Sequence, residues 1–149
     1  MLSISCLLLF SGCSTSKEVT AEKATQQVVL NREEMSKFRV KINAGKGEIT
    51  GVLALKWIDG QWRGSMINEF GIKAFDLVAS PNSCKLQQVI PFLNRWYIRK
   101  AIEADLSFLL WEATQGKTTK GKTMRFPDPN GFVLENNKHH ITYTFQLIE

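Results

Sequence analysis

The chain has 149 residues, a formal net charge of +5 and a pI of about 9.2, and this length suits one domain with a core of its own. Its three cysteines, at positions 6, 13 and 84, are too few and too widely spaced for a disulfide framework or a zinc finger. The mild basic excess fits contact with anionic lipid headgroups or simple solubility, and no helix-turn-helix, RNP-type strand or finger spacing indicates a nucleic-acid partner.

The first segment is an apolar run that ends in a cysteine. Residues 7–13 read Leu-Leu-Leu-Phe-Ser-Gly-Cys, and a polar tract follows. An apolar run of this kind before a polar tract is typical of an export signal, and it has about half of the ~20 apolar residues that a transmembrane helix needs. The small pair Ser11-Gly12 directly before Cys13 resembles the lipobox of bacterial lipoproteins. The resemblance implies a signal peptide over residues 1–12 and a Cys13 that is acylated, which would tether the protein to a membrane of the bacterial cell envelope.

This segment also departs from the lipobox pattern. Phe10 stands where an aliphatic residue is usual, and the first ten residues contain no Lys or Arg, although an export signal begins with a basic region. We therefore expect that the true start lies upstream. Ser14, rather than Asp, follows the cysteine, and by resemblance to lipoprotein sorting this favours the outer membrane, with the domain facing the periplasm. The alternative is a buried apolar strand that ends in Gly12-Cys13.

A polar segment separates the cysteine from the body of the protein. Residues 13–36 are rich in Ser, Thr, Lys, Glu and Gln, which predicts a tether that includes a short helix around residues 22–30. The single folded domain is expected over residues 37–149.

Five strands are expected in the first half of this domain. Their predicted ranges are residues 38–43, 49–57, 61–68, 72–79 and 85–90. Asp59-Gly60 is a two-residue hairpin signal between the second and third strands. Val52 and Ala54 lie opposite the apolar face of the second strand, which is therefore expected to be covered on both sides. All connections are too short for a crossover helix, so the strands form an antiparallel meander.

The second half begins with a long helix. Residues 92–112 follow Pro91, contain no Gly and carry two apolar stripes, which indicates a helix that is packed into a curved sheet. Gly116 ends it, residues 117–122 form a basic loop, and strands are expected over 123–126, 132–135 and 139–148. The order predicts an α+β fold, with a curved antiparallel sheet of about eight strands, a half-open β-barrel, and the helix on its concave face.

This order resembles the LolA/LolB-like superfamily of bacterial lipoprotein carriers and receptors. The resemblance rests on residues 51–55, on the turn segment 68–76 and on the helix over 93–110. It implies a half-open β-barrel lidded by helices over an apolar cavity that takes acyl chains or a lipoprotein. LolB members also carry a protruding apolar loop, and Phe70, at the tip of the turn 67–72, is the nearest candidate here.

Two groups of candidate binding residues follow. Trp57 and Trp62 flank the Asp59-Gly60 hairpin and are expected to form a cross-strand aromatic pair. The candidates for a lipid cavity are Leu53, Leu55, Trp57, Trp62, Met66, Phe75, Ile98 and Ile102. The candidates for membrane contact are Phe70, Lys117, Lys120, Lys122 and Arg125. A filled core uses the same residue types as a cavity wall, and a basic loop can simply be solvated, so both alternatives stay open.

Signals for catalysis or metal binding are weak. His139 and His140 are adjacent on a predicted strand and point to opposite faces, so they do not chelate one metal, and Cys84 is interpreted as a core residue. Ser65 lacks a Gly-x-Ser-x-Gly turn, and Glu103 is two residues from Asp105 and faces a different direction on the helix. We therefore expect no enzyme, no metal and no cofactor.

These observations predict a membrane-anchored envelope lipoprotein, monomeric and without a nucleic-acid partner. It would bind an acyl chain or a lipoprotein and assist lipoprotein localisation or outer-membrane assembly. The alternative is a structural or protein-interaction lipoprotein with a filled core and no lipid ligand.

Overall fold

The structure, a computed structural model, describes residues 27–148 as one open antiparallel sheet of eight strands with one helical segment. The expected signal peptide, Cys13 and most of the tether lie outside the described residues. The strands are β1 (Ser36–Ala44), β2 (Gly47–Ile58), β3 (Gln61–Asn68), β4 (Lys73–Ser80), β5 (Ser83–Gln87), β6 (Lys122–Asp128), β7 (Gly131–Asn136) and β8 (Ile141–Leu147). Helix α1 (Trp96–Ser107) lies between β5 and β6. The predicted α+β class and the sequence of five strands, a helix and three strands are confirmed.

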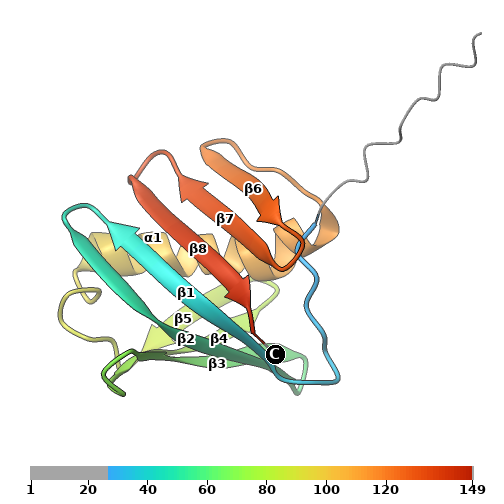
Figure 1. Cartoon of the computed structure of the whole chain (residues 1–149), viewed down its shortest axis with the longest axis horizontal. Helices are drawn as coiled ribbons and strands as arrows, with labels where there is room; N and C mark the ends of the chain where they lie inside the picture. Colours follow the sequence, from blue (N-terminus) through green and yellow to red (C-terminus); the bar gives the residue numbers. More distant parts are fainter. Residues whose placement is uncertain (1–26, 149) are drawn as a thin grey trace, which may run out of the picture.

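The sheet is ordered β5-β4-β3-β2-β1-β8-β7-β6, so the first and last strands pair with each other in its middle. Figure 1 shows the sheet curling around α1, which crosses its concave side. The two edge strands, β5 and β6, do not pair with one another, and the barrel is therefore half-open.

Alternation along the strands decides which side chains enter the core. In β1, Phe38, Val40 and Ile42 are at most 3% exposed, whereas Arg39 and Lys41 face solvent. The expectation that β2 is covered on both sides is wrong, since Val52 is 37% exposed. Only the concave face carries a helix, and β2 therefore buries one face.

Residues with positive φ set several strand ends. Asp59 (φ 49°) and Gly60 (φ 77°) form the predicted β2–β3 hairpin turn, and Trp57 and Trp62 pair across it with ring centroids 5.2 Å apart. The β5 strand ends at Gln87 rather than at residue 90, because Gln88 has a φ of 50°.

The last strand also starts later than expected. It begins at Ile141 rather than at residue 139, because His140 (φ 53°) belongs to the preceding turn. Both differences come from single residues in the left-handed region, which the alternation of apolar side chains does not reveal.

The helix begins four residues later than expected. The backbone N–H groups of Leu93 and Asn94 both donate to the carbonyl of Ile90, at 3.0 Å each, and this turn delays the helix until Trp96. Beyond α1 the helical path continues through a π-helical turn η1 (Phe108–Glu112) and a 3-10 turn η2 (Ala113–Gln115). Gly116 ends it with a φ of 70°, as predicted.

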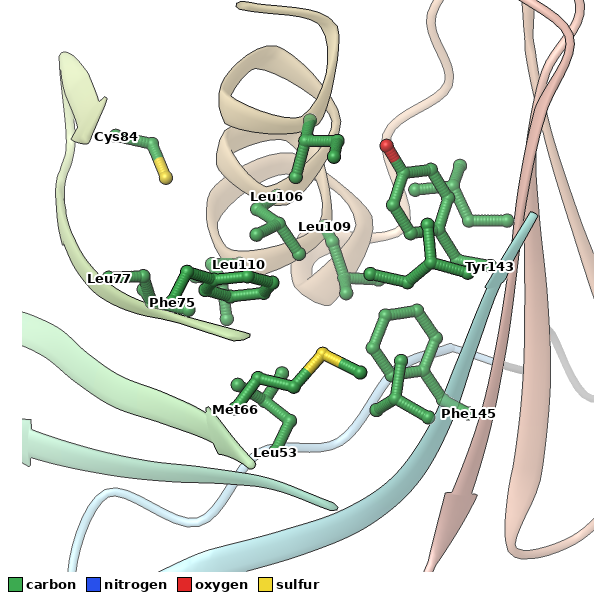
Figure 2. Packing of buried hydrophobic residues seen from close by; sticks show 14 of the residues in the cluster. Leu53, Met66, Phe75, Leu77, Cys84, Leu106, Leu109, Leu110, Tyr143 and Phe145 are labelled. Carbon is green, nitrogen blue, oxygen red and sulfur yellow. The ribbon is translucent and has the colours of Figure 1, made fainter. Parts of the chain in front are cut away.

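The core lies between the helical segment and the concave face of the sheet. Figure 2 shows Leu106, Leu109 and Leu110 of the helical segment between Phe75 on one half of the sheet and Phe145 on the other. Both predicted apolar stripes contribute to this core, one through Ile98, Ile102 and Leu109 and the other through Ala101, Phe108 and Trp111. Ala104, which was expected in the second stripe, is exposed. No helix within residues 27–148 is long and apolar enough to span a bilayer.

The first described residues, 27–30, are not helical, and Val28 among them packs into the core. Residues 27–30, the end of the predicted short helix, have no regular structure, and residues 22–26 lie outside the described part. Val28 is 3% exposed and belongs to the core cluster. Val28 and Val29 are β-branched and have only a modest helix preference, which the burial of Val28 against the domain outweighs.

Candidate functional site

A cleft of about 620 Å³ opens at the end of the half-barrel where α1 begins. We call it the rim cleft. Its lining comes from the β1–β2 turn, the segment before α1, the first turn of α1 and the β7–β8 turn: Ala44, Gly45, Lys46, Gly47, Phe92, Arg95, Tyr97, Ile98, His139 and Ile141. Figure 1 shows these turns gathered at one end of the molecule. The cleft thus joins segments that are far apart in the sequence.

Gly47 and Phe92 shape the wall of the rim cleft. A Cβ atom on Gly47 would lie 1.9 Å from the ring of Phe92, so only glycine lets this ring lie against β2. A second cleft of about 310 Å³ shares Phe92 and extends to Phe70 in the β3–β4 turn. Phe92 therefore lies between two openings at the same end of the barrel.

The rim cleft combines an apolar lining with basic side chains. Ile98 and Ile141 are buried in its wall, whereas Lys46, Arg95 and His139 are exposed around it. The Arg95 guanidinium donates to the Tyr97 hydroxyl at 3.4 Å, and this contact raises the pKa of Arg95. No acidic side chain of the described residues lines this cleft. Its chemistry suits a ligand with an apolar part and a negative end.

The predicted lipid-cavity residues mostly lie in the packed core. Seven of the eight are at most 8% exposed, and Trp57 is half-buried against the same cluster. Of these eight, only Ile98 lines the rim cleft, while Trp62 lines a cleft of about 250 Å³ at the other end of the helical segment. The structure brings the predicted residues together in one packed core, and they do not line a common cavity.

The predicted tryptophan pair is part of a larger aromatic group. Trp111 of η1 lies 5.6 Å from Trp57, and the Arg32 guanidinium lies 4.3 Å over the Trp57 ring. The indole N–H of Trp111 is buried without a hydrogen-bond partner in the structure. The contact between Trp111 and Trp57 could not be predicted, because the sequence does not show how the helix is positioned relative to the sheet.

The predicted membrane-contact residues fall into two separate places. Phe70 is 79% exposed in the β3–β4 turn, where the Asn68 side chain accepts from the N–H groups of Phe70 (3.0 Å) and Ile72 (2.8 Å). The basic residues lie at the opposite edge of the sheet, in β6 and the loop before it (Figure 1). The structure does not bring them together into one surface.

Two of the four basic candidates are already paired within the protein. Lys122 lies 3.1 Å from a carboxylate oxygen of Asp105, and Arg125 forms an ion pair with Glu135. Lys117 and Lys120 remain as the exposed part of the predicted basic group.

A buried polar network was missed by the sequence analysis. Asp105 is fully buried on α1 and accepts from the Tyr143 hydroxyl (2.7 Å) and from the Asn136 amide (2.8 Å), besides its ion pair with Lys122. Burial, and then the Asp105 charge, raises the pKa of Tyr143 well above its usual value. The network ties the helix to β6, β7 and β8. Its members lie 17 to 38 residues from Asp105 in the sequence, and no local pattern connects them.

Ser65 and Glu103, the two residues considered for a hydrolase site, lie on opposite sides of the sheet. The Ser65 hydroxyl donates to Asp76 on the convex face, and this bond is the largest of the contributions that lower the pKa of Asp76. Glu103, on the concave side, accepts from the Leu86 N–H at 3.0 Å and pairs with Arg99. The sheet lies between them, so they do not form one site.

His139 and Cys84 lie in different parts of the domain. His139 lines the rim cleft, and Cys84 is buried, where burial raises the pKa of its thiol to about 12. Among residues 27–148, no group of three or more His, Cys, Asp or Glu side chains is placed to hold a metal ion.

No protein-family model matches this chain, and no curated protein is significantly similar to it.

Proposed function

We propose that the protein is a lipid-anchored lipoprotein of the bacterial cell envelope that binds an acyl chain, or the acylated end of a lipoprotein, and assists lipoprotein localisation. The rim cleft is the observation that carries this proposal. Its volume, about 620 Å³, falls in the ~300–1,000 Å³ range of small-ligand sites. Burying methylene groups there stabilises a complex by about 0.8 kcal/mol each, so binding requires no covalent chemistry.

The surroundings of the rim cleft support an amphiphilic ligand. Arg95 and Lys46 lie where a carboxylate or phosphate would remain near solvent while the chain contacts Ile98 and Ile141. Trp96, which is 75% exposed, and Phe70 lie at the same end of the molecule. Exposed aromatic side chains of this kind favour a membrane interface, from which such a ligand would come.

Native mass spectrometry with palmitate tests the proposal. A form of the chain that begins at Ser14 is expected to take up one palmitate. Arg95→Glu should weaken uptake at least tenfold, because a negative side chain would repel the carboxylate. Lys100→Glu, an exposed change in the helix that directly follows Arg95 and outside the cleft lining, is the matched control and should bind as the parent does. A parent protein that takes up neither palmitate nor co-purifying lipid would contradict the proposal.

A second candidate, a structural or protein-interaction lipoprotein without a lipid ligand, is favoured by the burial of the predicted cavity residues in one core cluster. Tryptophan fluorescence of a Trp96→Phe variant separates three outcomes, because Trp57, Trp62 and Trp111 then report only on the interior. A spectral change on adding palmitate indicates entry into the core. Uptake without a spectral change indicates the rim cleft, and neither uptake nor change supports the second candidate.

A further inference from the structure

The convex face of the sheet carries an uneven distribution of charge. On β1–β4 its outward positions hold six basic side chains, namely Lys37, Arg39, Lys41, Lys56, Arg63 and Lys73. The same positions hold two carboxylates, Glu48 and Asp76. Each is already paired, Glu48 with Lys41 at 3.0 Å and Asp76 with Lys73 at 2.9 Å. We call this surface the convex basic face.

Two of these cations oppose each other directly. Lys56 of β2 is the register partner of Arg63 of β3, both are exposed, and neither forms an ion pair or a hydrogen bond within residues 27–148. Like charges directly opposite on neighbouring strands destabilise a sheet. Lys85 continues the row through Val78 and lies two strands, about 10 Å, beyond Arg63. An external anion would relieve this repulsion, since no carboxylate within residues 27–148 pairs with Lys56 or Arg63.

Aliphatic side chains lie between the cations. Val52 and Ile67 are register partners, 37% and 45% exposed, and they are flanked in the same row by Arg39 and Lys73. The outward positions of the described β1–β4 strands hold no aromatic side chain. Sheets that bind single-stranded nucleic acid use aromatic side chains to stack bases, and cations around aliphatic residues instead suit a lipid headgroup layer.

We propose that the convex basic face docks on an anionic membrane surface and binds its lipid phosphate groups. Lys56, Arg63 and Lys73 line an open depression of about 480 Å³ on this face together with Asp76, which already pairs with Lys73. Phosphates would therefore sit beside Lys56 and Arg63. Val52 and Ile67 would lie at the boundary between headgroups and acyl chains. The proposal concerns the orientation of the domain and is independent of any cargo in the rim cleft.

Vesicle co-sedimentation tests this docking. The full chain carries Cys13→Ser, so that an acyl anchor cannot contribute. It should bind vesicles that contain phosphatidylglycerol and should not bind vesicles of phosphatidylcholine alone. Replacing both Lys56 and Arg63 by Ala should weaken binding about 25-fold, since each basic residue near an anionic surface strengthens binding about fivefold. Replacing both Lys100 and Lys138 by Ala, which are exposed and lie outside the convex basic face and the predicted basic loop, removes the same charge elsewhere and should leave binding unchanged.

A third variant separates docking from folding. Lys56→Glu places a carboxylate opposite Arg63, so the melting temperature should stay the same or rise while vesicle binding falls. Palmitate uptake in the mass spectrometer should not change in this variant, which distinguishes a failure of docking from a failure of the rim cleft. Equal loss of binding in the two double-alanine variants would overturn the proposal. Absence of binding to phosphatidylglycerol vesicles would also overturn it. So would a protein that is retained on a column of immobilised nucleic acid and does not bind these vesicles.

Discussion

Asp105 shows how one residue can organise a fold without any sign of this in its sequence neighbourhood. A fully buried carboxylate is tolerated only when its charge and its lone pairs are satisfied. Lys122 supplies the charge, and Asn136 and Tyr143 supply the hydrogen bonds. The network joins the helix to the three C-terminal strands, so these strands are positioned by polar contacts as well as by apolar packing.

Replacing Tyr143 by Phe is expected to lower the free energy of unfolding by about 1.5–3 kcal/mol, the usual contribution of a hydrogen bond to a charged group. The Tyr143 hydroxyl is the donor to Asp105, and its loss leaves that carboxylate buried with fewer partners. Urea denaturation measures the effect. Thr144→Val on the exposed face of the same strand is the control and should change stability by less than about 0.5 kcal/mol.

The raised pKa of Tyr143 also predicts a dependence on alkaline pH. The folded state keeps the Tyr143 proton above pH ~10, where an unfolded tyrosine loses it. The stabilising contribution is therefore complete below pH ~10 and is lost as pH rises beyond that value. Urea midpoints measured near pH 8 and pH 11 should fall further in the parent protein than in Tyr143→Phe. An equal fall in both would contradict this assignment.

At the level of elements, α1 protects one edge of the sheet. Arg99 donates to the Leu86 carbonyl at 2.6 Å, and Glu103 accepts from the Leu86 N–H at 3.0 Å. These backbone groups belong to edge strand β5 and would otherwise be free to pair with another chain. The ion pair between Arg99 and Glu103 thus helps to cover this edge, in addition to its weak local effect on the helix.

Glu103→Ala should therefore expose the edge of β5. We expect a loss of about 1–3 kcal/mol in the free energy of unfolding, because the Leu86 N–H is left without its acceptor. We also expect concentration-dependent self-association, which sedimentation velocity detects. Lys100→Ala, an exposed neighbour on the same helix, should remain monomeric to the same degree as the parent.

The elements were largely predictable, and the candidate site was not. Alternating apolar residues and the Asp59-Gly60 turn were enough to place β3 at its observed bounds, since strand period and hairpin chemistry are local properties. The helix start was wrong because the Ile90 carbonyl closes a turn that Pro91 alone does not reveal. The rim cleft depends on Gly47 meeting Phe92 and on two distant turns meeting α1, and no local pattern contains that geometry.

At the scale of the whole molecule, the proposed anchor and the proposed docking face must be able to act together. The chain between Cys13 and Gln27 reaches about 50 Å when fully extended, at ~3.3–3.6 Å per residue. A helical segment as long as that from Trp96 to Gln115 spans only about 30 Å. The tether is therefore long enough for an acylated Cys13 to insert while the convex basic face lies on the same bilayer.

Metabolic labelling with palmitate tests the anchor itself. The chain, expressed in bacteria behind an export signal with a basic n-region, should incorporate the label, and Cys13→Ser should abolish it. Cys84→Ala should retain the label, because Cys84 is buried in the core and its thiol is held protonated. Label that persists in Cys13→Ser would contradict the lipobox assignment.

The central pairing of β1 with β8 has a consequence for biosynthesis. Five strands can assemble as soon as they are made, but the strand that joins them to β7 and β6 is the last to be synthesised. Until Leu147 has left the ribosome, one side of β1 has no partner, and α1 is held by its bonds to β5 without the Asp105 contacts to the last three strands. The incomplete chain therefore keeps an unpaired strand and exposed apolar side chains. A chaperone that binds nascent chains, or a translocase that accepts unfolded chains, could bind it in this state.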